Sequence, residues 1–211
     1  MGMKDFGFYL VMTNPVVGYE KCCEAAVKAG VKMVQLRMKD RETSRDELLD
    51  MACRLMAITR GSETNLIIDD DPSVAEEAGA AGVHVGQDDL PVDVVRTRYP
   101  GIRLVGLSTH NLDQAQESLA QDPDYIGVGP VFATPTKKIP DPVLGTELAG
   151  KMIAAVPYPA VAIGGINAEN LPDVIRAGAR NWSVVRAVCG STDPFAAITD
   201  LQRIAEAARL G

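Results

Sequence analysis

The sequence contains few aromatic residues, few cysteines and no long hydrophobic run. Phe, Trp and Tyr make up 5% of its 211 residues, so aliphatic side chains must fill most of any core. No apolar stretch approaches the ~20 residues that a membrane-spanning helix requires. The cysteines show no metal-ligand spacing and follow no secretory signal, so we expect reduced, half-buried thiols at Cys22, Cys23, Cys53 and Cys189. Together these absences favour a cytosolic protein.

Positive charge is also scarce. The 21 Lys and Arg residues are outnumbered by 28 Asp and Glu residues, which gives a formal net charge of -7 at pH 7. Nucleic acids and membrane surfaces are therefore not expected as partners, because neither polyanion would be attracted. A small phosphorylated ligand is still compatible with this charge, since a few local cations can bind it. The sequence has no G-x-G-x-x-G, Walker or Ser-His-Asp pattern, which argues against hydride transfer and acyl-enzyme chemistry.

Apolar runs alternate with helical patterns along the whole chain. Strands are expected at 8–12, 31–36, 66–68, 83–85, 104–108, 125–128, 160–163 and 182–185. Helices are expected at 18–29, 44–61, 72–78, 92–99, 112–119, 147–155, 171–177 and 194–210. Eight strand-helix units of about 26 residues each predict parallel strands in a single (β/α)8 TIM barrel domain over residues 1–211. An open doubly wound sheet is the alternative, although eight even units do not suggest its crossover pattern.

Two local signals support these boundaries. Ser44 and Glu47 have the spacing of a capping box at the start of the second helix. An Ala-Gly pair precedes several strands, which suggests a glycine with positive φ just after a helix at Gly30, Gly79, Gly82 and Gly178.

Acidic residues follow two neighbouring strands, in the stretch from Leu66 to Leu90. Asp69, Asp70 and Asp71 follow the first strand, and Asp88 and Asp89 follow the second. Parallel strands end at one rim of a barrel, so both clusters are expected within reach of one ion. Carboxylates with water and phosphate oxygens are the ligands that Mg²⁺ prefers. The alternative is that these aspartates only cap helices and solubilise loops.

Polar residues are expected all around this rim, where barrel enzymes place their active sites. The Gly164-Gly165 turn and the segment after the eighth strand predict a phosphate cup built from backbone N–H groups, unless the two glycines only form a tight turn. Arg37 and Lys39 can point to the same side of the chain, and with Lys137 and a metal they predict a second site for a diphosphate. His84 lies mid-strand and is expected to be a buried hydrogen-bonding residue.

At these positions the sequence resembles the thiamine phosphate synthase family, from about Phe8 to Ala207. The matching pieces, in order, are YLVMTN (9–14), QLRMK (35–39), IIDDD (67–71), GVHVGQDDL (82–90), GLSTH (106–110), YIGVGPVFATPTKK (125–138) and AIGGI (162–166). The resemblance implies an Mg²⁺-dependent transferase that joins hydroxymethylpyrimidine diphosphate to hydroxyethylthiazole phosphate, giving thiamine phosphate and pyrophosphate. It also suggests a homodimer.

The resemblance assigns roles to individual residues. It implies that the metal is held by Asp70 and Asp89, and that Arg37, Lys39, Ser108 and Lys137 act in catalysis. The pyrimidine diphosphate would contact Gln35, Arg37, Lys39, Asp69, Ser108 and Lys137. The thiazole phosphate would contact Thr134, Thr136, Gly165, Val185 and Arg186.

The sequence departs from the family at two of these positions. Asp69 stands where the family usually has asparagine, and a carboxylate beside a diphosphate is repulsive unless it binds metal, pairs with Arg37 or Lys39, or takes a proton. Arg186 stands where many relatives have serine, so it could contact the phosphate or turn to solvent. Two other functions compete: a thiazole tautomerase, which needs no diphosphate site, and a non-catalytic protein that binds thiamine phosphates. The diphosphate-site residues favour the synthase.

Overall fold

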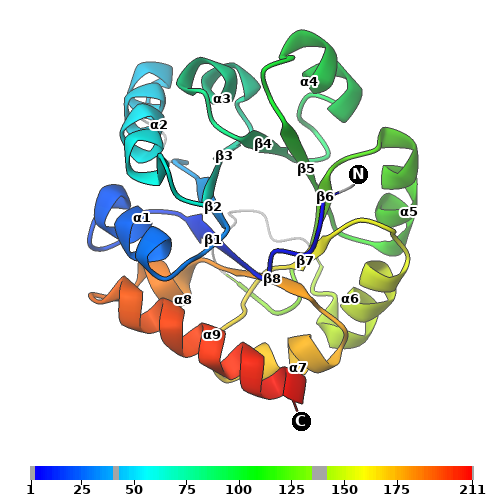
Figure 1. Cartoon of the computed structure of the whole chain (residues 1–211). Helices are drawn as coiled ribbons and strands as arrows, with labels where there is room; N and C mark the ends of the chain where they lie inside the picture. The colour runs from blue at the N-terminus through cyan, green and yellow to red at the C-terminus, as the bar shows by residue number, and fades with distance from the viewer. Residues whose placement is uncertain (1–2, 40–42, 135–141, 211) are drawn as a thin grey trace.

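A computed structural model describes residues 3–39, 43–134 and 142–210, and in these residues eight parallel strands form a closed barrel in sequence order (Figure 1). The strands are β1 (Phe8–Met12), β2 (Met33–Leu36), β3 (Asn65–Asp69), β4 (Gly82–Val85), β5 (Leu104–Thr109), β6 (Tyr125–Val128), β7 (Ala160–Ala162) and β8 (Asn181–Val184). β1 pairs with both β2 and β8, which closes the barrel and leaves no sheet edge. The predicted TIM barrel is thus confirmed, and the open sheet is excluded.

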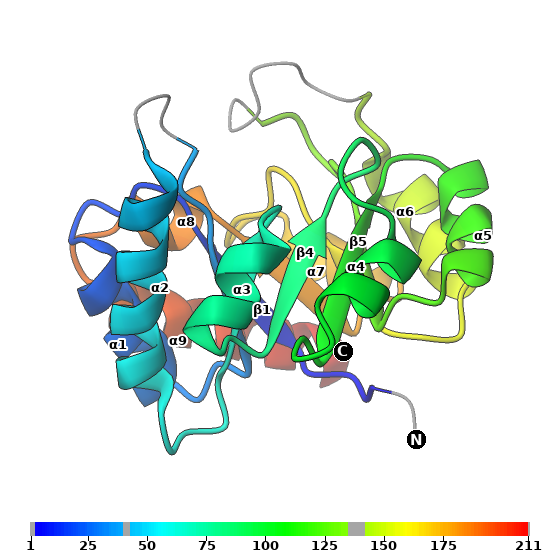
Figure 2. The ribbon, with the colours of Figure 1, turned by 90° about the horizontal axis from the view of Figure 1, so that it is seen from above.

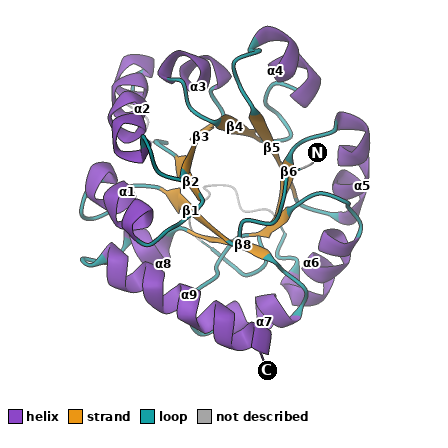
Figure 3. Ribbon diagram, viewed as in Figure 1, coloured by secondary structure: helices purple, strands orange, loops and turns teal. Residues whose placement is uncertain are grey.

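Helices surround the barrel, as Figure 3 shows. They are α1 (Tyr19–Lys28), α2 (Arg45–Thr59), α3 (Pro72–Ala78), α4 (Val92–Arg98), α5 (Leu112–Gln121), α6 (Gly145–Ala154), α7 (Leu171–Arg176), α8 (Arg186–Cys189) and α9 (Pro194–Leu210). The predicted capping box at α2 is present, because Ser44 and Glu47 each accept a hydrogen bond from the other's backbone N–H. α8 was not predicted; it is a single turn between β8 and the final helix.

Three of the four Ala-Gly predictions are confirmed and one is wrong. Gly30, Gly79 and Gly178 have positive φ angles of 71°, 71° and 102°. Gly82 instead lies inside β4, where a Cβ atom would lie 2.1 Å from the carbonyl oxygen of Leu104. Glycine is needed there because the neighbouring strand passes close, and not because a helix ends.

The cysteine prediction also needs correction. Cys22, Cys23 and Cys189 are fully buried and Cys53 is exposed, so none is half-buried. The buried thiols lie among apolar side chains between the barrel and its helices. All four are free, as expected.

Alternating side chains divide the apolar residues into two cores. Phe8, Leu10 and Met12 of β1 pack outward against the helices, whereas Tyr9 and Val11 point into the barrel. The inner core consists of Tyr9, Val11, Met33, Ile67, Ala81, Tyr125 and Val161. Phe6 contacts it from the N-terminal side, with its ring centroid 6.1 Å from that of Tyr9. This packed interior and Phe6 block the barrel at the N-terminal ends of the strands. A ligand must therefore enter from the C-terminal ends.

The N-terminal segment leaves the barrel at its lower end in Figure 2. Among the described residues, no helix is both long and apolar enough to cross a membrane.

Candidate active site

A cavity of about 1140 Å³ opens at the C-terminal ends of the strands, and all eight strands contribute side chains to its wall. The predicted site residues that line it are Gln35, Arg37, Lys39, Asp69, Asp70, Asp89, Ser108, Thr134, Gly165, Val185 and Arg186. Thr136 and Lys137 lie outside the described residues. The structure therefore brings together every predicted site residue that it describes.

Two cations and two carboxylates meet where β2 and β3 end. Asp69 Oδ2 lies 3.5 Å from Arg37 Nε and 3.4 Å from Lys39 Nζ, and Lys39 also donates a hydrogen bond to Asp70. The Asp69 side chain is only 10% exposed. Of the outcomes open to a carboxylate at this position, pairing with Arg37 and Lys39 is the one that the structure shows.

Burial and the charges in this cluster shift the pKa values of Asp69 and Lys39. Burial and then the neighbouring Asp70 raise the pKa of Asp69 to about 6, although Arg37 and Lys39 oppose the shift. Burial alone would lower the pKa of Lys39, but its contacts with Asp70 and Asp69 outweigh burial and raise it. Lys39 is therefore held as a cation at the rim.

Asp70 and Asp89 come from neighbouring strand ends and are suited to a divalent cation. Asp70 has a left-handed backbone (φ 58°), which its N–H stabilises by donating to the His84 carbonyl at 2.9 Å. Asp89 Oδ2 accepts a hydrogen bond of 2.7 Å from the Gly86 N–H. Partial burial and the nearby Asp70 raise the pKa of Asp89, as expected for two carboxylates that share one site.

Two carboxylates alone cannot complete the coordination of Mg²⁺. In the part of the chain that the structure describes, no group of three or more His, Cys, Asp or Glu residues forms a metal site. The donor set of Asp70 and Asp89 fits a hard cation that takes its other ligands from water and substrate phosphate. Asp71 has a different role, because its Oδ1 accepts the Val74 N–H at 3.0 Å and caps α3. The helix-cap alternative thus holds for one of these aspartates.

The opposite side of the rim presents mainly backbone. Gly164 and Gly165 have φ angles of 100° and 66°, and a Cβ on Gly165 would lie 2.7 Å from both Phe132 Cβ and the Ala133 carbonyl oxygen. Both glycines are therefore required by the loop that follows β6, which packs directly on them. Val185 and Arg186 begin α8 beside this turn, and the exposed Arg186 side chain lines the cavity.

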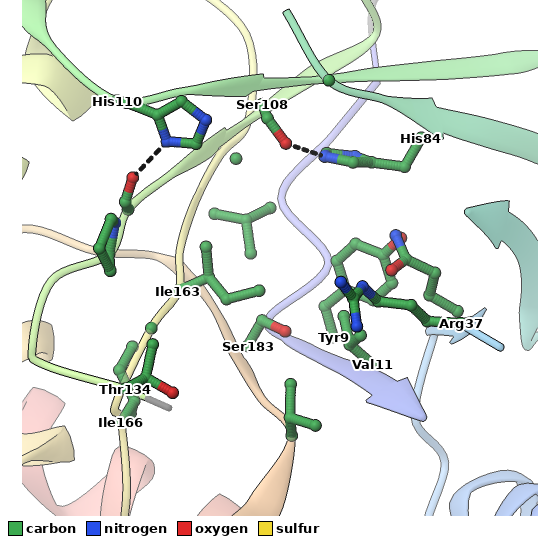
Figure 4. Close-up of a pocket in the computed structure, with 18 of the residues that line it drawn as sticks. Tyr9, Val11, Arg37, His84, Ser108, His110, Thr134, Ile163, Ile166 and Ser183 are labelled. Atoms are coloured by element: carbon green, nitrogen blue, oxygen red, sulfur yellow. Dashed lines mark hydrogen bonds between the residues drawn. The ribbon is translucent and has the colours of Figure 1, made fainter. Parts of the chain in front are cut away.

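A chain of hydrogen bonds runs across the cavity floor, partly visible in Figure 4. His84 Nε2 lies 2.9 Å from Ser108 Oγ, and His84 Nδ1 lies 3.2 Å from the Tyr125 hydroxyl. That hydroxyl lies 3.0 Å from the Tyr9 hydroxyl, which accepts a hydrogen bond from Gln35 Nε2 at 3.0 Å. The expectation that His84 is a hydrogen-bonding residue is confirmed, but the expectation that it is buried is wrong, because its side chain is only partly buried and lines the cavity.

Sequence reasoning missed the inner residues Tyr9, Tyr125 and Ser183. They lie within β1, β6 and β8, before the last residue of each strand, whereas the predicted site residues lie mostly at or after the strand ends. The signal was a polar atom in an otherwise apolar strand, at an inward-facing position of the two-residue alternation. Ser183 is fully buried, and its hydroxyl has no hydrogen-bond partner among the described residues.

Comparisons with known proteins agree with this geometry. The family model described as "Thiamine monophosphate synthase" matches residues 8–188. The chain is 38% identical over 205 residues to "Thiamine-phosphate synthase" of Anaeromyxobacter dehalogenans, covering 96% of this chain and 89% of that protein. It is 41% identical over 181 residues to the Chloroflexus aurantiacus protein of the same name, covering 86% of this chain and 82% of that protein. Its structure is similar to that of "Thiamine phosphate pyrophosphorylase" from Pyrococcus furiosus, with a TM-score of 0.87, 29% identity and 98% of each chain covered.

Proposed function

Because the chain belongs to the thiamine phosphate synthase family, we propose that it joins hydroxymethylpyrimidine diphosphate to hydroxyethylthiazole phosphate, forming thiamine phosphate and releasing pyrophosphate. One observation carries the proposal. A single cavity has a cluster of cations and carboxylates on one side and a glycine-rich backbone turn on the other. Two phosphorylated substrates can therefore bind face to face.

The pyrimidine diphosphate occupies the side of β2–β5 in this proposal. Arg37 and Lys39 neutralise its phosphates, with Lys137 predicted to join them, and Gln35 and Ser108 donate hydrogen bonds. Asp70 and Asp89 would hold Mg²⁺, which supplies positive charge to the leaving pyrophosphate when it is bound. Asp69 contributes indirectly, since it orients the Arg37 and Lys39 side chains.

The thiazole phosphate occupies the side of β7 and β8. Gly165 and the backbone N–H groups near Val185 and Arg186 accommodate the phosphate, because amide groups at a turn favour an anion. Thr134 and the predicted Thr136 face the same substrate. The Arg186 side chain, which lines the cavity, adds a positive charge on this side.

The reaction needs positioning and electrostatic stabilisation more than it needs a base. As the carbon–oxygen bond to pyrophosphate breaks, the electron-rich aminopyrimidine stabilises positive charge on its methylene, and the thiazole nitrogen donates its electron pair to form the new bond. No proton is removed from the nucleophile. The absence of a Ser-His-Asp pattern in the sequence is consistent with this route.

The tautomerase alternative does not account for the charged side of the cavity, because a proton shift on a thiazole phosphate requires no diphosphate site. Arg37, Lys39, Asp70 and Asp89 all line the cavity wall. A homodimer and a cytosolic location stay predictions.

The proposal is tested by pyrophosphate release from the pyrimidine diphosphate, with and without thiazole phosphate, over a series of Mg²⁺ concentrations. We expect release only when the metal and both substrates are present. The same assay on Asp69→Asn shows whether the departure from the family helps or hinders. A metal-loaded protein that binds both substrates without releasing pyrophosphate would overturn the proposal and favour the non-catalytic alternative.

A further inference from the structure

The hydrogen-bond chain on the cavity floor includes residues to which the proposed function assigns no contact with a substrate. It connects Gln35 on β2, Tyr9 on β1, Tyr125 on β6, His84 on β4 and Ser108 on β5 through four contacts of 2.9–3.2 Å. Gln35 and Ser108, at its two ends, face the cavity, whereas the two tyrosines between them are at most 2% exposed. The buried middle of the chain therefore links two groups that the proposed function assigns to the same substrate.

The donor and acceptor types of these groups fix the direction of the hydrogen bonds in this chain. Gln35 Nε2 can only donate, so the Tyr9 oxygen accepts there and its proton is available to the Tyr125 oxygen. Tyr125 then donates to His84 Nδ1. A neutral imidazole that accepts at Nδ1 carries its proton on Nε2, and that proton points to Ser108 Oγ. Ser108 thus accepts from His84 and directs its own proton elsewhere, into the cavity.

The opposite direction is chemically distinct. If Gln35 presented its oxygen to Tyr9, each bond would reverse, His84 would carry its proton on Nδ1, and Ser108 would donate to His84. Ser108 would then offer only lone pairs to a ligand. A diphosphate oxygen and a pyrimidine ring nitrogen both need a donor, so the first direction suits these groups of the proposed substrate, whereas the second would suit only its amino group.

The surrounding backbone leaves space for this chain. A Cβ atom on Gly106 would lie 2.5 Å from both His84 Nδ1 and the Tyr125 hydroxyl oxygen, so any other residue would separate these two groups. Burial raises the pKa of both Tyr9 and Tyr125, which keeps their hydroxyl protons in place. The middle of the chain is therefore neutral and complete before a ligand arrives.

We propose that this chain fixes His84 as the Nε2–H tautomer and so holds Ser108 as a hydrogen-bond donor to the pyrimidine diphosphate. Tyr9, Tyr125 and His84 are positioning residues, since they act through Ser108. The role toward the substrate rests on the proposed function. The tautomer does not, because it is set in the free protein.

Nitrogen-15 NMR of histidine-labelled protein tests the tautomer directly. The chain has only two histidines, and the second is an internal reference: His110 Nδ1 lies 2.7 Å from the Gly129 carbonyl oxygen, which requires a proton on Nδ1. About two pH units above the ordinary histidine pKa of about 6.5, we expect opposite tautomers for His84 and His110. A proton on Nδ1 of His84 would overturn the proposal. A His110→Asn variant assigns the signals.

Tyr125→Phe tests whether the chain acts through Ser108. We expect the His84 signals to shift toward a mixture of tautomers, and kcat to fall about tenfold with little change in KM. In Ser108→Ala the same substitution should add no further loss, because the group through which Tyr125 acts has gone. Independent losses in the double variant, or unchanged His84 signals, would contradict the proposal.

Two further variants make the result decisive. Tyr158→Phe is the matched control, because its hydroxyl bonds Ser118 Oγ at 2.5 Å outside the cavity; it should leave both the signals and kcat unchanged. If Tyr125→Phe does not fold, Tyr9→Phe breaks the chain one bond earlier and should produce the same spectral change. A protein with the predicted tautomers but no pyrophosphate release would refute the proposed function and leave the hydrogen-bond chain established.

Discussion

On the β2–β4 side of the rim, charged side chains face the cavity, whereas on the β7–β8 side the chain presents glycines and a helix start. We call the first the side-chain half (Arg37, Lys39, Asp69, Asp70, Asp89) and the second the backbone half (Gly164, Gly165, Val185, Arg186). The side-chain half binds through atoms that a substitution removes. The backbone half depends on space that a substitution fills, so the two should fail in different ways.

The largest effect is expected from Arg37→Ala in the side-chain half. It removes a phosphate contact and leaves the buried Asp69 with one cation fewer, so we expect transition-state stabilisation to fall by about 4 kcal/mol, or roughly a thousandfold in kcat/KM. Steady-state kinetics with the pyrimidine diphosphate varied measures this loss. Lys151→Ala is the control, because its exposed ion pair with Glu147 contributes to neither half. A loss below tenfold would contradict the role of Arg37.

Gly165→Ala should break the backbone half by adding one methyl group. The new Cβ would lie 2.7 Å from Phe132 Cβ at a φ of 66°, so we expect a loss of about 2–3 kcal/mol in unfolding free energy and a raised KM for thiazole phosphate. Denaturant unfolding and kinetics measure the two effects. Gly61→Ala is the matched control, since its φ is 77° but nothing lies within 4 Å of its Cβ. Equal losses in both variants would mean that the clash contributes nothing.

Asp69→Asn should raise the unfolding free energy, by less than Gly165→Ala lowers it. It removes two ion pairs but also the cost of burying a carboxylate beside Asp70, so we expect the metal-free protein to gain about 1–2 kcal/mol. Activity should stay within about tenfold of the native value, because Arg37 and Lys39 remain. Urea unfolding with a chelator present measures the change. A loss of stability would show that the ion pairs outweigh the cost of burial.

The smallest effect is expected from Asp71→Ala, one residue beyond the proposed metal ligand Asp70. Losing the cap of α3 should cost about 1 kcal/mol, and Asp71→Ser should restore most of it. The apparent Mg²⁺ affinity, measured from the activity titration, should not change in either variant. A changed metal affinity would place Asp71 in the metal site.

The sequence predicted the side-chain half more completely than the rest. Charged residues directly after apolar runs are conspicuous, and the parallel-strand rule brings them to one rim. The pairing of Asp69 with Arg37 and Lys39 was one of three outcomes left open, because side-chain distances depend on how the strands are staggered. The sequence could not choose between them.

The backbone half was predicted for an incomplete reason. The glycine pair was recognised, but not that the loop after β6 packs against it, since that contact joins segments far apart in sequence. α8 was missed because one helical turn has no periodic pattern. The cavity floor was missed because Tyr9 and Tyr125 look like core residues until the barrel closes and brings their hydroxyl groups together.

The most direct test of the division into two halves is calorimetric binding of each substrate separately to the native protein, Arg37→Ala and Gly165→Ala, with Mg²⁺ present. We predict that Arg37→Ala weakens binding of the pyrimidine diphosphate and leaves binding of the thiazole phosphate unchanged, whereas Gly165→Ala does the reverse. If each variant weakened both substrates equally, the two halves would not be separate binding sites.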